Sequence, residues 1–297
     1  MRRVRRVGFF TTLVLVCAVG SACASATAHP SSSSIANTTA ASSTALPPTT
    51  TTSTLPTLRQ AASFHRALDR ARPLRVLVVG DLVGITLGRG MQLWAYDTGG
   101  AVVRNEARAW CSLGRYLPRD VFGPQNSSAG CDDWGTRWAQ LVQTFDPDVV
   151  FVMYTVWEVI PRKLPAASGY TRPGNPALDA WQLSEYQHAT DVLSARGARV
   201  VFFSLACEGR TTIRRGEPYW YVNRRTLPAL ARSRPQVRLL DLDSLLCGGG
   251  RVRNDLGGVH DIRPDDAHFS DLGALALAGW AMPIVLGRAP PPPYALN

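Results

Sequence analysis

The sequence predicts an α/β domain built on a doubly wound parallel sheet. Largely apolar stretches, such as residues 74–79 and 149–154, alternate along the chain with segments of helical periodicity. Continuous apolar runs are typical of parallel strands that helices cover on both faces. The alternation implies right-handed crossovers between neighbouring strands. The folded domain is expected to span residues 58–288, a length compatible with one domain.

The expected elements follow one another through this domain. Strands are predicted at residues 74–79, 101–103, 149–154, 199–205 and 237–242. Apolar residues recur at a spacing of three or four between them, which predicts helices. These helices span residues 58–68, 85–96, 134–145, 177–196 and 270–286. Asp146-Pro147 is expected to end the third helix, Gly197 to be the C-cap of the fourth, and Ser270 to cap the last.

The N-terminal residues 1–24 have the layout of an export signal. Four arginines precede an apolar run over residues 7–20, and small residues follow. The sequence allows three alternatives for this segment: a cleaved signal peptide, lipidation at Cys23, or an uncleaved membrane anchor. Residues 25–57 are rich in Ser, Thr and Pro and are expected to form a disordered linker. We therefore predict an exported protein, extracellular or in the cell envelope, that meets a membrane only through its N-terminus.

The C-terminal residues 289–297 contain a proline run and are expected to be a disordered tail. The formal net charge is +10, and the four arginines of the export signal account for four of these charges. The remaining excess is spread along the chain, which favours a solvated basic surface over a nucleic-acid site. The protein is expected to be a monomer.

No cofactor is predicted. The glycines at 80, 84, 88 and 90 have neither the Walker nor the dinucleotide-binding spacing, which argues against a nucleotide-binding module. Four cysteines remain beyond the export signal: Cys111, Cys131, Cys207 and Cys247. An even number in an exported domain indicates two disulfides. We favour Cys111–Cys131 and Cys207–Cys247, because each pair flanks one loop. Zinc is the rival ligand, but the chain has no CxxC pair and no clustered histidines.

Two short segments could carry chemistry. Gly80-Asp81-Leu82 follows the first strand, at the edge where α/β proteins place their functional groups. Asp265 and His268 stand three residues apart, just before the last helix. A carboxylate at this spacing can orient an imidazole and stabilise its cation after it takes a proton.

With these segments the chain resembles the SGNH (GDSL-type) hydrolase family over most of residues 74–286. The likeness is strongest to exported actinobacterial members, including the SGNH domains attached to membrane acyltransferases. It is carried by Gly80-Asp81-Leu82-Val83, Cys111, Pro147-Asp148-Val149-Val150, Val156-Trp157-Glu158-Val159, Gly197-Ala198-Arg199-Val200-Val201, Cys207 and Asp265-Asp266-Ala267-His268-Phe269-Ser270. The resemblance implies a flavodoxin-like, three-layer α/β/α fold with a central parallel five-stranded sheet. It also implies an ancestor that cleaved or transferred acyl groups.

The family's functional positions are only partly matched. The resemblance assigns Asp265 and His268 to the catalytic base pair. It assigns the serine nucleophile position to Leu82, after Asp81, and leucine cannot attack a carbonyl. The oxyanion-hole positions fall on Trp110, Thr155 and Trp157, where the family has glycine, glycine and asparagine.

The sequence is compatible with two functions. The first is a pseudoenzyme that binds an envelope glycan or a protein partner without turnover, with Trp157 as a stacking face for a sugar. The second is an active ester hydrolase, or an O-acetyl esterase or transferase, acting on an acylated small substrate or an envelope glycan. The second needs a displaced nucleophile, at Thr86 or Thr155, or a water activated by His268. We prefer the pseudoenzyme, because loss of the nucleophile removes most of the acceleration of a triad.

Overall fold

The domain is organised around one five-stranded parallel sheet. The computed structural model describes residues 71–115, 130–165, 167–209, 215–247 and 252–289. The strands lie in the order β2-β1-β3-β4-β5, and every neighbouring pair is parallel. Their bounds are Leu74–Gly80 for β1, Ala101–Asn105 for β2, Val149–Met153 for β3, Arg199–Phe203 for β4 and Val237–Leu240 for β5. The predicted sheet is confirmed.

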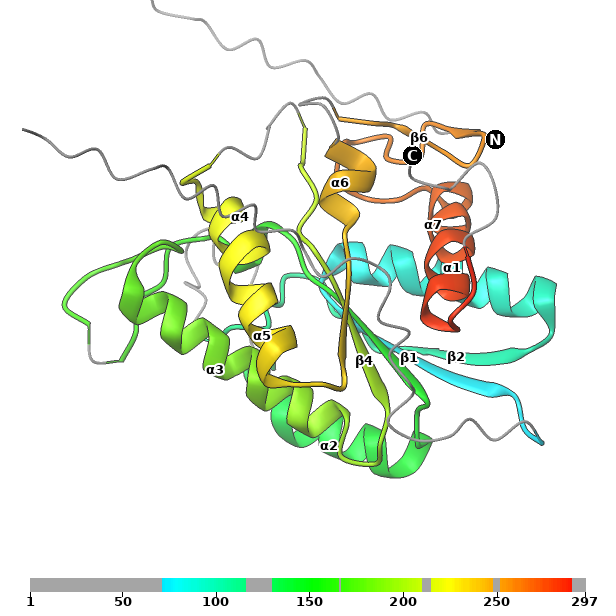
Figure 1. Ribbon diagram of the computed structural model, residues 1–297, viewed down its shortest axis with the longest axis horizontal. Helices are drawn as coiled ribbons and strands as arrows, with labels where there is room; N and C mark the ends of the chain where they lie inside the picture. The colour runs from blue at the N-terminus through cyan, green and yellow to red at the C-terminus, as the bar shows by residue number, and fades with distance from the viewer. Residues whose placement is uncertain (1–70, 116–129, 166, 210–214, 248–251, 290–297) are drawn as a thin grey trace, which may run out of the picture. The chain divides into compact units, whose positions relative to one another are not determined.

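Helices cover both faces of this sheet (Figure 1). On one face lie α1 (Leu82–Thr98), α6 (Leu242–Cys247) and α7 (Asp271–Val285), and their apolar side chains form one core with the sheet. On the other face lie α2 (Trp134–Phe145), α3 (Pro176–Leu193) and α5 (Leu227–Ser233), which form a second core with it. The two cores take alternate residues of the central strands β1, β3 and β4, so the fold has the three α/β/α layers that were expected.

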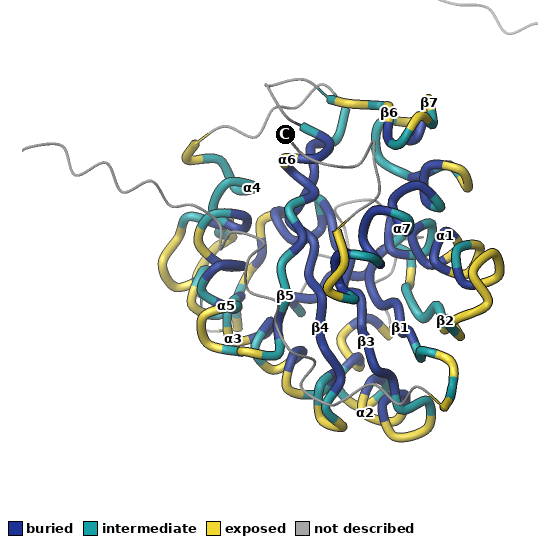
Figure 2. Tube along the Cα trace, turned by 45° about the vertical axis from the view of Figure 1, so that its right-hand side comes forward, coloured by how far each residue is buried: buried dark blue, intermediate teal, exposed yellow. Residues whose placement is uncertain are grey.

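The central strands are buried on both sides (Figure 2). Every residue of β3 and β4 is buried, and β1 is buried from Val76 onward. A side chain of either orientation therefore meets apolar neighbours, which explains the absence of polar alternation in these segments. Trp134 and Trp138 of α2 are 2% and 1% exposed and belong to the second core.

Helices α1 and α3 differ from their expected bounds. Helix α1 begins at Leu82 rather than at residue 85, because the side chain of Asp81 accepts hydrogen bonds from the first free N–H groups of the helix. Helix α3 ends at Leu193 with Ser194 as its C-cap, so Gly197 is not the cap. Gly197 instead lies in the following turn, with φ +87°, and donates its N–H to the Ser194 carbonyl oxygen.

Several short elements were not predicted. A 3-10 turn, η1 (Val156–Glu158), follows β3, and α4 (Pro218–Tyr221) leads through a π-helical turn, η2 (Val222–Thr226), into α5. The strands β6 (Asp255–Leu256) and β7 (Val259–His260) form an antiparallel pair. Segments of two to five residues are too short for hydrophobic periodicity to reveal them.

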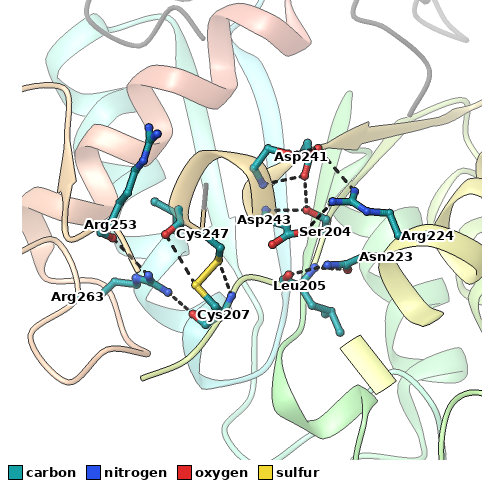
Figure 3. The surroundings of a disulfide bond; sticks show 12 residues. Ser204, Leu205, Cys207, Asn223, Arg224, Asp241, Asp243, Cys247, Arg253 and Arg263 are labelled. Carbon is teal, nitrogen blue, oxygen red and sulfur yellow. Dashed lines mark hydrogen bonds and ion pairs between the residues drawn. A yellow bond between two sulfur atoms is a disulfide. The ribbon is translucent and has the colours of Figure 1, made fainter. Parts of the chain in front are cut away.

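Both disulfides pair as predicted. Cys111 bonds to Cys131, and Cys207 bonds to Cys247, which joins the loop after β4 to the end of α6 (Figure 3). Within the described ranges, no group of histidine, cysteine and acidic residues could hold a metal ion. No helix in these ranges has the length and hydropathy to cross a membrane. The export signal, the linker, the helix over residues 58–68 and nearly all of the C-terminal tail lie outside the described residues.

The predicted cap of the last helix is confirmed, and it gives a first test. The hydroxyl of Ser270 accepts a hydrogen bond from the Gly273 N–H at 3.1 Å. Replacing Ser270 by Ala should lower the free energy of unfolding by about 1 kcal/mol, since one N–H of the first turn loses its partner. Urea unfolding measures this loss. The matched change Ser184→Ala, inside α3 at an exposed position, should cost less than about half as much. Equal losses would contradict the capping role.

Candidate functional site

The candidate site lies at the carboxyl edge of the sheet, where β1, β3 and β4 end. The residues that follow these strands include Asp81, Thr155 and Glu208. Parallel strands bring their carboxyl ends to one edge, and the loop before α7 meets them there. The Gly209 N–H donates to the Asp266 carbonyl oxygen at 3.4 Å, so the loop after β4 contacts the segment that carries Asp265 and His268.

The turn between β1 and α1 depends on Gly80. Its φ is +156°, and a Cβ at this position would lie 1.9 Å from the Met153 carbonyl oxygen of β3. Only glycine allows this close approach of the two strand ends. The turn thereby places Asp81 inside the sheet edge and Leu82 at the first position of α1, where the side chain is half-buried.

Asp81 is fully buried and joins two strand ends. Its Oδ1 accepts the N–H groups of Val83 and Gly84 at 2.9 and 3.3 Å, which caps α1. Its Oδ2 accepts the backbone N–H of Thr155 at 2.9 Å and the Thr155 hydroxyl at 2.6 Å. Burial raises the pKa of Asp81 to about 7, although these hydrogen bonds favour the charged form.

The structure brings Asp265 and His268 together. The Asp265 Oδ2 lies 2.6 Å from the His268 Nδ1, and its Oδ1 accepts the backbone N–H groups of Ala267 and His268. Partial burial disfavours the Asp265 charge, but these hydrogen bonds outweigh it and lower the pKa of Asp265 to about 2. The pair can therefore orient the imidazole and stabilise its cation. The His268 side chain is 35% exposed, so a ligand could reach it.

The same loop packs against the first turn of α1. The backbone N–H of Phe269, directly after His268, donates to the Thr86 hydroxyl at 3.4 Å. Thr86 lies one helical turn after Leu82, so the nucleophile position and the histidine belong to neighbouring segments. The sequence-predicted base pair and the Gly80-Asp81-Leu82 turn therefore lie at the same edge of the sheet.

The two threonines considered as displaced nucleophiles both donate their protons elsewhere. The Thr86 hydroxyl donates to the Val83 carbonyl oxygen at 2.8 Å. The Thr155 hydroxyl donates to Asp81, and Thr155 is only 6% exposed. In the described residues, the hydrogen bonds of His268 all go to Asp265. A nucleophilic hydroxyl needs an adjacent base that takes its proton and room for a substrate. Thr86 donates to a carbonyl oxygen, which is no base, and Thr155 is buried beside the Asp81 carboxylate, away from His268's hydrogen bonds.

The positions that the resemblance assigns to the oxyanion hole are two tryptophans and a threonine. Trp110 has φ +63°, a backbone conformation that favours glycine, and its side chain is 38% exposed. Its ring packs edge-on against Trp157, with 5.6 Å between the centroids. Trp157 is 6% exposed, which corrects the expectation that it offers a stacking face for a sugar. Trp110 is the exposed aromatic ring of this pair.

A buried polar network holds η1 in place behind these tryptophans. The Glu158 carboxylate accepts hydrogen bonds from the Ser112 hydroxyl, the Leu113 N–H and the Tyr186 hydroxyl at 2.6–2.7 Å. Arg162 is 1% exposed and donates to the Gly114 carbonyl oxygen, the Ser112 hydroxyl and the Trp157 carbonyl oxygen. This network positions the segment around Trp110 against the end of β3.

Glu208 is a residue of the site that sequence reasoning missed. Its carboxylate accepts a hydrogen bond from the Val156 N–H at 3.3 Å, and it interacts electrostatically with His268. The Cys207–Cys247 disulfide and the Arg263 guanidinium, which donates to the Cys207 carbonyl oxygen at 2.6 Å, fix the preceding residue (Figure 3). The available signal was its place directly after a disulfide cysteine, in the loop that follows β4.

This carboxylate is unfavourable for acyl chemistry. Hydrolysis of an ester passes through an oxyanion, which hydrogen-bond donors must stabilise. Val156 stands between the two oxyanion-hole positions Thr155 and Trp157, and its N–H is already bonded to Glu208. A negative charge near this position would oppose the charge that develops in the reaction.

Comparison with known proteins gives likeness of fold alone. No protein-family model and no curated protein sequence matches the chain. Among solved structures, the periplasmic domain of a lipopolysaccharide acetyltransferase from Salmonella ser. Paratyphi A is 10% identical, with a TM-score of 0.47 over 69% of this chain and 80% of that one. An acetyl xylan esterase is 18% identical, with a TM-score of 0.44 over 69% of this chain and 96% of that one.

A GDSL-like lipase from Bacteroides thetaiotaomicron VPI-5482 is 13% identical, with a TM-score of 0.44 over 78% of this chain and 98% of that one. Identities this low say nothing about activity. The described domain is a parallel five-stranded sheet between helical layers, and its function must be argued from its own site.

Proposed function

We propose that the protein is an exported pseudoenzyme whose domain binds an envelope glycan without turning it over. The observation that carries this proposal is that the candidate site contains no usable nucleophile among the described residues: Leu82 has no proton to give, and the Thr86 and Thr155 hydroxyls donate theirs elsewhere. The Glu208 carboxylate at the Val156 N–H adds a second obstacle to acyl transfer. The layout of residues 1–24 and the two disulfides support export.

The choice of a glycan rests on Trp110. Its half-exposed ring packs on Trp157, in the turn that follows β3, and the Asp265 carboxylate and the His268 imidazole belong to the loop that meets the same edge of the sheet. Aromatic faces pack on the apolar faces of sugars, while carboxylates accept the hydrogen bonds of sugar hydroxyls. A protein partner at the same site is the other ligand that this proposal allows.

One observation favours a second function, ester hydrolysis by a water molecule. The Asp265–His268 hydrogen bond is the arrangement that a general base needs, and it is present although the nucleophile is not. In this reading His268 takes a proton from water, and the hydroxide attacks the ester carbonyl carbon directly.

The two functions are separated by an esterase assay. The purified protein should hydrolyse p-nitrophenyl acetate no faster than the His268→Ala variant does, because the site offers His268 no nucleophile to activate. Turnover that falls by about 100-fold or more in His268→Ala would establish the second function instead, since that is the typical contribution of a general base.

Binding is tested by tryptophan fluorescence with N-acetylglucosamine and galactose oligosaccharides as probes. A saturable change should appear in the wild type and be lost in Trp110→Ala. The control Tyr96→Ala removes an 87% exposed aromatic ring near the far end of α1 and should bind as the wild type does. If the fluorescence does not change with any of these sugars, glycan binding is contradicted, and a protein partner is left as the ligand.

A further inference from the structure

Arg108 belongs to the loop that leads from β2 to Trp110. Its backbone N–H donates to the Gly80 carbonyl oxygen at 2.8 Å, directly before Asp81 and Leu82. Two residues later the same loop carries Trp110, whose half-exposed ring is the proposed sugar-binding face. The Arg108 side chain is itself exposed. The loop thus places an exposed cation two residues from an exposed aromatic ring, next to the turn that follows β1.

The guanidinium of Arg108 is held beside the Cys111–Cys131 disulfide. Its Nη1 donates to the Gly130 carbonyl oxygen at 3.2 Å. The disulfide joins the next residue, Cys131, to Cys111, and the Cys131 Sγ lies 3.8 Å from the Trp110 carbonyl oxygen. The segment that accepts the hydrogen bond of the guanidinium therefore lies against the segment that carries the ring.

A second guanidinium meets the same oxygen. Arg137 of α2 donates its Nη1 to the Gly130 carbonyl oxygen at 3.0 Å, so two cationic groups converge on one acceptor. Burial lowers the pKa of Arg137, and the charge of Arg108 lowers it further. Asp133 forms an ion pair with Arg137, and no other carboxylate among the described residues forms one with either guanidinium. One of the two positive charges therefore lacks a counter-charge in the described part of the chain.

Arg108 keeps most of its hydrogen-bonding capacity for a ligand. A guanidinium has five N–H donors in a planar fork, whose geometry matches that of a carboxylate. Within the described ranges, the Arg108 guanidinium uses one donor, at the Gly130 carbonyl oxygen. Its remaining donors are open to a ligand because the side chain is exposed. Hydrogen bonds between two charged groups are about twice as strong as neutral ones, so these donors favour an anionic partner.

The charge of Asp265 limits where an anionic group can bind in the site. Burial opposes this charge, but hydrogen bonds from the His268 segment lower the pKa of Asp265 to about 2. The Asp265 carboxylate is therefore charged at neutral pH and repels an anion, while it can accept hydrogen bonds from neutral sugar hydroxyls. An acidic group of the same ligand is favoured at Arg108 instead.

We propose that the ligand of the candidate site is an acidic sugar, whose ring packs on Trp110 and whose carboxylate binds the Arg108 guanidinium. This inference rests on the proposed glycan binding and names the class of glycan. A neutral sugar can pack on the same aromatic ring, but it leaves the charge of Arg108 without a partner. Arg108 is thus the residue that selects acidic over neutral sugars.

Tryptophan fluorescence with trigalacturonic acid and its methyl ester tests the proposal, because the ester keeps the sugar and removes the charge. The wild type should bind the acid at least about 5-fold more tightly, the gain expected of an ion pair at an exposed position. Arg108→Gln should lose this preference, while its amide can still donate to the Gly130 carbonyl oxygen and hold the loop. The matched change Arg104→Gln, in the surface ion pair with Glu106, should keep the preference.

The outcomes separate the acidic sugar from glycan binding in general. Equal affinities of the wild type for acid and ester would overturn the acidic sugar and leave glycan binding intact. A preference that survives in Arg108→Gln would overturn the role of Arg108. If neither galacturonate binds although galactose or N-acetylglucosamine oligosaccharides do, the acidic sugar alone is wrong. If no sugar binds, both proposals are wrong.

Salt gives a second measurement on the same two ligands. Ion pairs at a protein surface weaken as the ionic strength rises, because dissolved ions screen their charges. Raising the NaCl concentration from about 0.01 M to about 0.5 M should remove most of the preference for the acid. The affinity for the uncharged ester should change little. A preference that stays constant over this range would contradict an ion pair between the sugar and the exposed guanidinium.

Discussion

A protein that combines Leu82→Ser with Trp110→Gly should hydrolyse p-nitrophenyl acetate at least about 100-fold faster than the wild type. The first change supplies a hydroxyl at the start of α1, in the segment that packs against the residue after His268. His268, oriented by Asp265 at 2.6 Å, can then act as its base, and such a base typically contributes 10²- to 10⁴-fold.

The second change uses a backbone that already has a glycine-like conformation. Trp110 has φ +63°, so glycine at this position is expected to relieve strain of about 1 kcal/mol while the packing on Trp157 is lost. Removing the ring opens the oxyanion side to a substrate. We therefore expect Leu82→Ser alone to be much less active than the combined variant.

The control for this experiment is His268→Ala in the combined variant, which should return the rate to that of the wild type. Activity that survives His268→Ala would mean that the new serine acts without the histidine. The combined variant could be inactive although its circular dichroism is unchanged. The Glu208 carboxylate is then the remaining obstacle, and adding Glu208→Gln should produce turnover.

The elements of the sheet were predictable because their signals are local. Residues 149–154 are apolar without interruption, residues 74–79 are interrupted only by Arg75, and β1 and β3 occupy almost the same positions. The Asp265–His268 contact was also predictable, since three residues of a single turn separate the two side chains. The cysteine pairing followed from the loops that each pair encloses.

The missed features depend on contacts between distant segments. Glu208 belongs to the site because β3 and β4 are neighbours and because a disulfide holds the residue before it. The burial of Trp157, which removes it as a sugar-binding face, arises from packing against Trp110, 47 positions earlier in the numbering. Neither is visible in a local pattern, because both depend on which strands meet in the sheet.

The largest loss of stability is expected at Arg162, in the buried network behind the tryptophans. Its guanidinium is 1% exposed and binds the carbonyl oxygens of Gly114 and Trp157 as well as the Ser112 hydroxyl. Arg162→Met should lower the free energy of unfolding by about 3–5 kcal/mol, because these acceptors lose their donors and the Glu158 charge stays buried without its cation. The matched change Arg196→Met, at the surface pair with Asp146, should cost less than about 1 kcal/mol.

A double-mutant cycle with Glu158→Gln locates the origin of this loss. Both side chains bind the Ser112 hydroxyl, and the Glu158 charge opposes the effect of burial, which lowers the pKa of Arg162. If the buried charge causes much of the loss, the double variant should be about 1–3 kcal/mol more stable than the sum of the single effects predicts. Strict additivity in urea unfolding would show instead that Arg162 stabilises the fold only through its carbonyl contacts. Because this network holds the segment of Trp110 against the end of β3, its loss should also weaken any ligand binding that depends on Trp110.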